Sequence, residues 1–256
     1  MGQHLYVDQR HPHWQLALAR WIDELQAIKQ RKGAEQLILR DLPADNDALI
    51  DCLRQLGFSA HRLPDMLVLP SLDWTSREEY LQRLGQKYRY NVKKEAIARE
   101  EQFELEVEQN ADSATVRRCY ELYSAVHARS YKINVFKLPL ALFEQAFRHP
   151  EYDLLRLYLR GSRNTADLVA CLLSHVHGGH YSALLVGLDQ AHLTSHGIYK
   201  QILFRCVERA HALNATQLNL AFTADLEKKK LGARPIPTLA LVQQDDDYAS
   251  TVMAAI

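Results

Sequence analysis

Apolar positions along the chain change between helical and extended spacing, and these changes divide it into elements. Large apolar side chains recur at helical intervals over residues 14–28, and Gly33 follows them as a helix stop. Residues 36–40 then predict a short buried strand. A second helix that ends at Gly57 and a strand over residues 66–69 complete this first group.

A long basic helix is predicted over residues 75–99. Thr75 and Ser76 each stand three residues before a glutamate, which is the spacing of a capping box. One face of this helix is apolar and the opposite face is cationic, since residues 83–99 hold six basic side chains and one acidic side chain.

The rest of the chain predicts a strand, two helices, three antiparallel strands and then a helix, strand, helix and strand. Gly178 and Gly179 supply a two-residue hairpin turn between two of the strands. The predicted ranges are, in order, strand 103–107, helices 113–130 and 139–147, strands 152–159, 168–177 and 180–187, helix 196–213, strand 217–221, helix 225–231 and strand 238–243.

Two landmarks repeat along the chain at one offset. Asp8-Gln9-Arg10-His11 and the strand that begins at Gln36 return 181 residues later, at Asp189-Gln190-Ala191-His192 and Gln217. This pattern predicts two copies of one α/β unit, the first copy being partial and beginning with an edge strand over residues 5–7. The expected divisions are residues 1–72 for the partial repeat, 73–100 for a basic linker helix and 101–256 for the complete repeat.

The composition of the chain restricts the kinds of partner and the cellular compartment that we expect, but it does not identify a partner. The chain has 256 residues, 47% of them hydrophobic, and equal numbers of basic and acidic side chains, 31 each, so no global field draws it to nucleic acid or to an anionic membrane. No stretch has the apolar length of a bilayer span. The four cysteines form no Cys-x-x-Cys pair, which favours buried thiols in a reducing compartment. We therefore expect a cytoplasmic protein with no membrane partner.

The order of elements resembles the Gcn5-related (GNAT) acyltransferase fold, an α/β fold with a mixed sheet. Residues 78–94 look like the linker helix of Fem-type aminoacyltransferases, and residues 53–58 and 228–233 are similar to that group's two glycine-containing helix ends. The resemblance implies transfer of an acyl or aminoacyl group from acyl-CoA or aminoacyl-tRNA to the amine of a small molecule or peptide. It implies no tightly bound cofactor. The alternative is a non-catalytic ligand-binding or regulatory module derived from such an enzyme.

The resemblance also suggests catalytic side chains. Lys228 matches the family's lysine and could stabilise a developing oxyanion or a phosphate, although the three consecutive lysines could equally be a solvated surface run. Tyr199 could return a proton to the leaving group, and Asp189 could accept one from the amine. The alternatives are a tyrosine packed against the sheet and an ordinary turn aspartate.

Phosphate groups of the donor or acceptor could be held in two places. Amides at the start of a helix, around Ser195, His196 and Gly197, could hold the phosphates of a CoA or a tRNA end. Residues 190–197 contain one glycine where the family's pyrophosphate loop has two, so we expect weak binding of acetyl-CoA.

The basic helix is the second of these places. Arg89, Lys93 and Lys94 could bind a phosphate-bearing substrate, or they could be the solvated face of an amphipathic helix.

Other chemistries have weaker support. His175, His177 and His180 invite a metal hypothesis, but no carboxylate or cysteine is close in sequence, so we predict no metal site. A Gly-x-Ser-x-Gly elbow and a P-loop are both absent from the sequence, which argues against a serine hydrolase and an NTPase.

Overall fold

The computed structural model describes residues 5–108, 111–129, 136–161 and 164–244, and it divides the chain into two compact units. Unit 1 is Met1–Met66 with Pro235–Ile256, and unit 2 is Leu67–Arg234. These limits differ from the predicted divisions, because the last strand groups with the N-terminal part of the chain. Strand pairing between segments distant in sequence decides this grouping, and local sequence pattern does not report it.

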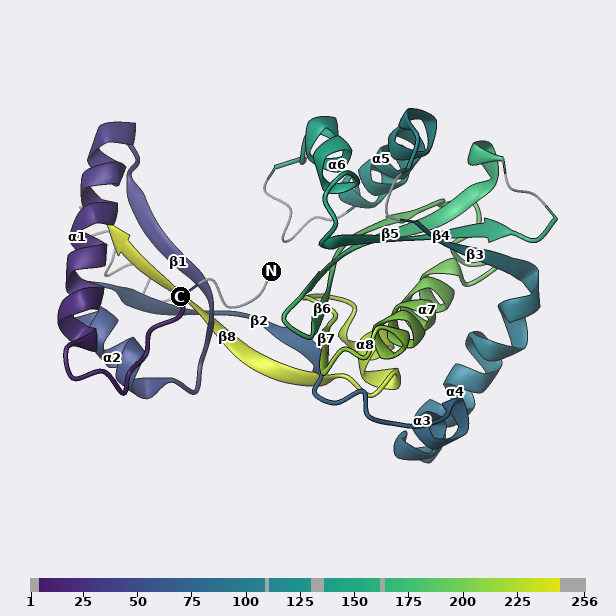
Figure 1. Cartoon of the computed structure of the whole chain (residues 1–256), viewed down its shortest axis with the longest axis horizontal. Coiled ribbons are helices and arrows are strands. Elements are labelled where there is room, and N and C mark those ends of the chain that lie inside the picture. The colour runs from purple at the N-terminus through teal and green to yellow at the C-terminus, as the bar shows by residue number, and fades with distance from the viewer. Residues whose placement is uncertain (1–4, 109–110, 130–135, 162–163, 245–256) are drawn as a thin grey trace. The chain divides into compact units, whose positions relative to one another are not determined.

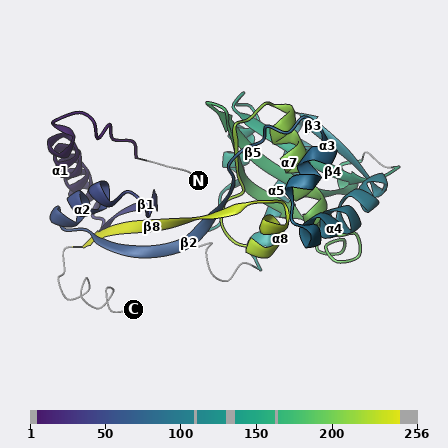
Figure 2. The ribbon, with the colours of Figure 1, turned by 90° about the horizontal axis from the view of Figure 1, so that it is seen from below.

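In unit 1 the described residues form helices that pack on a group of strands (Figures 1 and 2). Its elements are α1 (Trp14–Lys32), β1 (Gln36–Pro43), α2 (Asp47–Gln55), most of β2 (Ser59–Leu69) and most of β8 (Arg234–Gln244). β8 lies between β1 and β2 and is antiparallel to β1. Leu18, Ile22, Leu53 and Leu241 are buried in its core. Gly33 ends α1 in a left-handed conformation, as predicted.

The expected edge strand over residues 5–7 is absent, and this part of the prediction is wrong. Residues 5–8 have no regular secondary structure. Leu5 and Val7 instead pack on the core of unit 1, so their alternation reflects side-chain burial without backbone pairing. The order helix, strand, helix, strand does occur twice, as α1 to β2 and again in the last four elements of the chain.

Unit 2 is built on five strands and the end of β2. The strands are β3 (Phe103–Glu108), β4 (Tyr152–Leu159), β5 (Leu168–His177), β6 (His180–Leu188) and β7 (Gln217–Asn219). Neighbouring strands are antiparallel from β3 to β6, whereas β6 and β7 are parallel. Gly178 and Gly179 form the predicted hairpin turn, with φ of 57° and 79°. Over the whole chain the strand order is β1-β8-β2-β7-β6-β5-β4-β3.

Helices cover both faces of this part of the sheet (Figure 1). One face packs against α5 (Ser113–His127) and α6 (Leu140–Ala146), and the other against α7 (Ile198–Ala212). Residues 153–158 of β4 are therefore all buried. Two of them, Asp153 and Arg156, are charged, and they form ion pairs with Arg209 at 2.9 Å and with Glu106 at 3.2 Å. The last helix of the unit is α8 (Asp225–Lys230), and η2 (Thr165–Asp167) precedes β5. The predicted end of the 113–130 helix, Ser130, lies outside the described residues.

The long basic helix predicted over residues 75–99 is divided into three pieces. These are α3 (Arg77–Arg83), α4 (Gln86–Glu95) and the 3-10 helix η1 (Ile97–Gln102). Leu84 is extended, with ψ of 142°, and Gly85 begins α4 as its N-cap. Glycine is unfavourable inside a helix, so the helix breaks at Gly85. The apolar periodicity continues across this position and therefore predicted one unbroken helix.

Candidate functional site

The sheet of unit 2 opens where its two parallel strands separate. β6 and β7 pair at His180↔Gln217, Tyr181↔Leu218 and Ser182↔Asn219, and at no further position in the described chain. β6 continues to Leu188 along β5, whereas the chain after β7 continues along β2. Residues 183–188 thus present a strand edge that pairs with no other described strand on the β7 side. Backbone N–H and C=O groups on such an edge are free to bind a ligand.

A strained turn follows β7 at this opening. Ala221, Thr223 and Ala224 have φ of 59°, 64° and 50°, and they are three of the five non-glycine residues with positive φ in the described chain. Each such residue costs about 1–3 kcal/mol and persists because its surroundings hold it. Asn219 holds one end of the turn, since its Oδ1 accepts a hydrogen bond of 2.8 Å from the Ala221 N–H.

Lys228 holds the middle of the same turn. Its side chain on α8 is only 4% exposed, and its Nζ donates a hydrogen bond of 2.5 Å to the carbonyl oxygen of Phe222. Burial lowers the pKa of Lys228 to about 8, although Asp225 and Cys206 oppose this change. The interpretation of residues 228–230 as three solvated lysines is therefore wrong for Lys228.

Tyr199 lies in the first turn of α7 and packs, half-buried, against the main core of unit 2. Burial raises the pKa of its phenol, and the negative charge of Glu227 on α8 adds to this increase. The hydroxyl therefore keeps its proton at neutral pH. A proton donor at this position is compatible with the chemistry, whereas a proton acceptor is not.

Asp189 is already committed to other partners. Its carboxylate forms an ion pair with Arg118 of α5 at 3.1 Å and lies 3.6 Å from Nδ1 of His192, and it accepts a hydrogen bond of 2.9 Å from the Ala191 N–H. Among the described residues, no hydrogen bond or ion pair joins Asp189 to Lys228 or Tyr199. This geometry is that of a turn aspartate with a salt bridge.

The loop before α7 is contacted by Arg99 of η1, a residue that the sequence did not single out. Gly197 begins α7 in a left-handed conformation, and no side chain caps the helix. Arg99, from η1, donates a hydrogen bond of 3.4 Å to the carbonyl oxygen of Ser195. A Cβ added at Gly197 would lie 3.2 Å from Nη1 of Arg99, so the guanidinium lies directly on this loop. Ser195 and His196 contact each other through Oγ and Nδ1 at 2.9 Å.

The three basic residues predicted to bind substrate have different surroundings. Nη2 of Arg89 donates to the carbonyl oxygens of Gln82 and Leu84, both at 3.2 Å, and so satisfies the end of α3. Lys93 and Lys94 are exposed on α4. The Lys94 ammonium lies 5.8 Å from the ring centre of Tyr90, which is also exposed.

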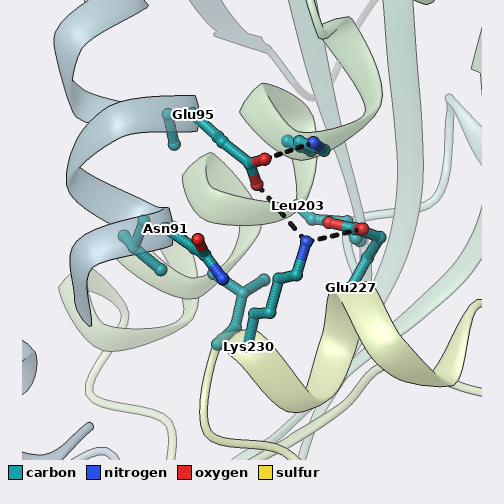
Figure 3. A pocket seen from close by; sticks show the side chains of 9 residues that line it. Asn91, Glu95, Leu203, Glu227 and Lys230 are labelled. Carbon is teal, nitrogen blue, oxygen red and sulfur yellow. Dashed lines mark hydrogen bonds and ion pairs between the residues drawn. The ribbon is translucent and has the colours of Figure 1, made fainter. Parts of the chain in front are cut away.

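A charged network joins α4, α7 and α8 beside this site (Figure 3). Glu95 binds Lys200 at 2.8 Å and Lys230 at 3.4 Å, and Lys230 binds Glu227 at 2.9 Å. The pocket that these residues line has a volume of about 20 Å³, which is room for one water molecule. The network therefore holds the three helices together and leaves no space for a substrate.

The histidines on β5 have a carboxylate partner that lies far from them in sequence. Glu151 contacts His175 at 3.3 Å and His177 at 3.1 Å. In the described part of the chain, no group of three potential ligands has a geometry that could hold a metal ion. The same residues contain no helix with the length and apolar character needed to cross a membrane.

The chain is similar in sequence to one protein family and in fold to several solved structures. Residues 86–229 match the family model of the acetyltransferase (GNAT) domain. L-PGS from Bacillus licheniformis has a similar fold, with a TM-score of 0.64 and 13% identity over 96% of this chain and 78% of that chain. FemX is similar at a TM-score of 0.65 and 11% identity, over 94% and 79% of the two chains. The sequence matches no curated protein.

The family model covers more than half of the chain, and the observed element order and mixed sheet agree with the fold that the sequence predicted. The separation of the two parallel strands lies inside the matched segment. The chain therefore belongs to the GNAT acetyltransferase family and is an N-acyltransferase.

Proposed function

We propose that the chain transfers an acyl or aminoacyl group to a primary amine at the opening between β6 and β7. The observation that carries this proposal is the free edge of β6 after Ser182. Backbone N–H groups on that edge can donate to the carbonyl oxygen of the donor, where negative charge develops during attack. Such fixed donors need no reorganisation during the reaction.

The proposed reaction is a direct displacement. The amine nitrogen forms a bond to the carbonyl carbon, and the bond from that carbon to the sulfur or oxygen of the leaving group breaks. The amine loses one proton, and the leaving group gains one. Tyr199, whose raised pKa keeps the phenol protonated, is the proposed proton donor. Asp189 would have to release Arg118 before it could accept the amine proton, so a water molecule is the better acceptor.

The donor's phosphates are proposed to bind at the start of α7. Ser195 and Gly197 bring backbone amides there, and Arg99 adds a guanidinium from η1, whereas the His196 N–H already donates to the carbonyl oxygen of His192 at 3.2 Å. Lys93 and Lys94, exposed on α4, are proposed to contact a longer phosphate-bearing substrate such as a tRNA end. Arg89 does not take part in this contact, because its guanidinium donates hydrogen bonds to the last carbonyl oxygens of α3.

Acyl-CoA and aminoacyl-tRNA are both chemically suitable donors, and the acceptor is proposed to be the amine of a small molecule or peptide. The four cysteines are buried free thiols, which supports the expectation of a reducing cytosol.

The test of the proposed function is a pair of measurements. Calorimetric titration with acetyl-CoA examines the first donor, and we expect weak binding because the loop over residues 190–197 has one glycine. A micromolar dissociation constant would contradict that expectation. Transfer from aminoacyl-tRNA to a panel of amines examines the second donor. If the folded wild-type protein neither binds acetyl-CoA nor transfers the aminoacyl group from aminoacyl-tRNA, acyl transfer at this opening is refuted.

For the second donor, the double variant Lys93→Gln, Lys94→Gln should bind tRNA more weakly and with a smaller dependence on salt. The control is Lys32→Gln, another exposed lysine at a helix C-terminus, in unit 1. Equal salt dependence in the two variants would exclude α4 as the phosphate-binding surface.

A further inference from the structure

The turn after β7 is unusual in both its backbone and its location. Ala221, Thr223 and Ala224 are left-handed within four residues, and Thr223 carries a β-branched side chain that disfavours this conformation. The turn begins two residues after Asn219, the last position at which β7 pairs with β6. It therefore forms the β7 side of the opening described above.

Besides the first backbone bonds of α8, which the Glu227 and Lys228 N–H groups donate to the Ala224 carbonyl oxygen, contacts from three different elements hold this turn. The Leu67 N–H of β2 donates to the carbonyl oxygen of Ala221 at 3.0 Å, and Asn219 accepts from the N–H of the same residue. The third contact is the hydrogen bond from Nζ of Lys228 to Phe222. It acts on Phe222, which lies between the left-handed residues Ala221 and Thr223.

The ammonium of Lys228 is buried and bound to the backbone, so it is not available to contact a substrate in this structure. Its side chain is 4% exposed, and it points back from α8 onto the backbone of the turn that precedes the helix. A buried charge is retained in proteins when it is hydrogen-bonded. Phe222, whose carbonyl oxygen accepts the bond, is itself 7% exposed.

We propose that Lys228 is a positioning residue that locks the turn over residues 221–224, in which Ala221, Thr223 and Ala224 are left-handed, and so fixes the β7 side of the opening. Its ammonium acts on the Phe222 carbonyl oxygen, and it does not contact the reacting acyl group. The functional meaning of this role rests on the proposed acyl transfer, but the lock itself is a property of the chain alone.

Hydrogen exchange measured by mass spectrometry tests the lock without any substrate. In Lys228→Met, which keeps most of the stem packing, the amides of residues 221–224 should exchange about tenfold faster or more, the effect of losing one hydrogen bond to a charged group. Peptides from β4 and β5 should be unchanged. The matched control is Lys229→Met on the same helix, because the Lys229 side chain is 37% exposed and lies 3.7 Å from Asp225. That variant should exchange like the wild type.

A second substitution separates a lock from a general loss of packing. Glycine adopts positive φ without strain, so adding Thr223→Gly to Lys228→Met should restore part of the lost protection. A general loss of packing around α8 would not be reversed by this glycine. Should Lys228→Met fail to fold, Lys228→Leu, which also removes the Nζ donor, takes its place in the comparison.

The inference is overturned if residues 221–224 exchange within twofold of the wild-type rate in the folded Lys228 variant, or if the glycine restores nothing. Titration of the same variants with coenzyme A is a separate measurement. Absence of binding by the wild-type protein would count against the proposed donor site and would leave the exchange result standing.

Discussion

Lys228→Met should change how the stability of the protein depends on pH. The ordinary pKa of lysine is 10.5, and burial lowers that of Lys228 to about 8. Between these two values the unfolded chain holds the lysine proton and the folded chain does not. The free energy of unfolding of the wild type should therefore rise with pH across this window, relative to the variant.

The size of the effect follows from the difference between the two pKa values. One pKa unit corresponds to about 1.4 kcal/mol, so the full change approaches about 3 kcal/mol. Below pH 8 the cost of burying the charged ammonium lowers the free energy of unfolding by this full amount. Above pH 10.5 the cost is absent, because the lysine is neutral in both the folded and the unfolded chain. The same side chain donates the hydrogen bond to Phe222, which contributes about 1.5–3 kcal/mol to the folded state of the wild type. Removing both terms at pH 7 should leave the melting temperature within a few degrees of the wild-type value.

The assay is urea unfolding of the wild type, Lys228→Met and Lys229→Met at several pH values from 7 to 10.5. Other groups that titrate in this range are common to the three proteins and cancel in the differences. The wild type and Lys229→Met should follow parallel curves, and Lys228→Met should diverge from them above pH 8. A constant difference across the range would show that Lys228 is not a desolvated ammonium, and the reasoning would fail.

Three further predictions follow from particular contacts. Gly187→Ala should destabilise the protein by about 1–3 kcal/mol in a thermal melt, because the new Cβ would lie 2.7 Å from Sγ of Cys171, whereas Gly85→Ala has no atom within 4 Å and should change little. Arg99→Gln should weaken binding of coenzyme A by calorimetry severalfold at an unchanged melting temperature, and equal affinity would remove this guanidinium from the phosphate site. Lys230→Met should lower stability by about 1 kcal/mol through loss of its two ion pairs, with a smaller difference in high salt, and an undiminished difference would assign the loss to packing.

The order of elements could be predicted from the sequence because it depends on local spacing. Apolar periodicity placed α1, α5 and α7, and the glycine pair placed the hairpin. Two of the failures concern strand pairing between segments distant in sequence, whereas the break at Gly85 in the predicted basic helix has a local cause. The backbone at residues 5–8 pairs with no strand, and β8 joins unit 1 through a neighbour almost two hundred residues away.

The candidate site could be predicted only in part, for the same reason. The sequence singled out Lys228 by resemblance, but three consecutive lysines do not reveal which one faces the core. Arg99 lay at the end of the basic run and carried no motif, and its position over Gly197 arises from packing. Glu151 joined His175 and His177 because β4 and β5 pair at Tyr152↔His175, a register that no local pattern reports.

The three lysines of α8 explain how so short a helix can be placed precisely. A helix of six residues is not stable on its own, and it depends on contacts outside itself. Lys228 binds the turn before the helix, Lys229 remains at the surface, and Lys230 joins Glu95 of α4 to Glu227. Consecutive residues on a helix point in different directions, so adjacent lysines contact different elements. Ion pairs of Lys230 thus link α8 to α4, and the hydrogen bond of Lys228 links α8 to the turn beside β7. The basic helix that the sequence first marked as a substrate surface is also a structural support of the opening.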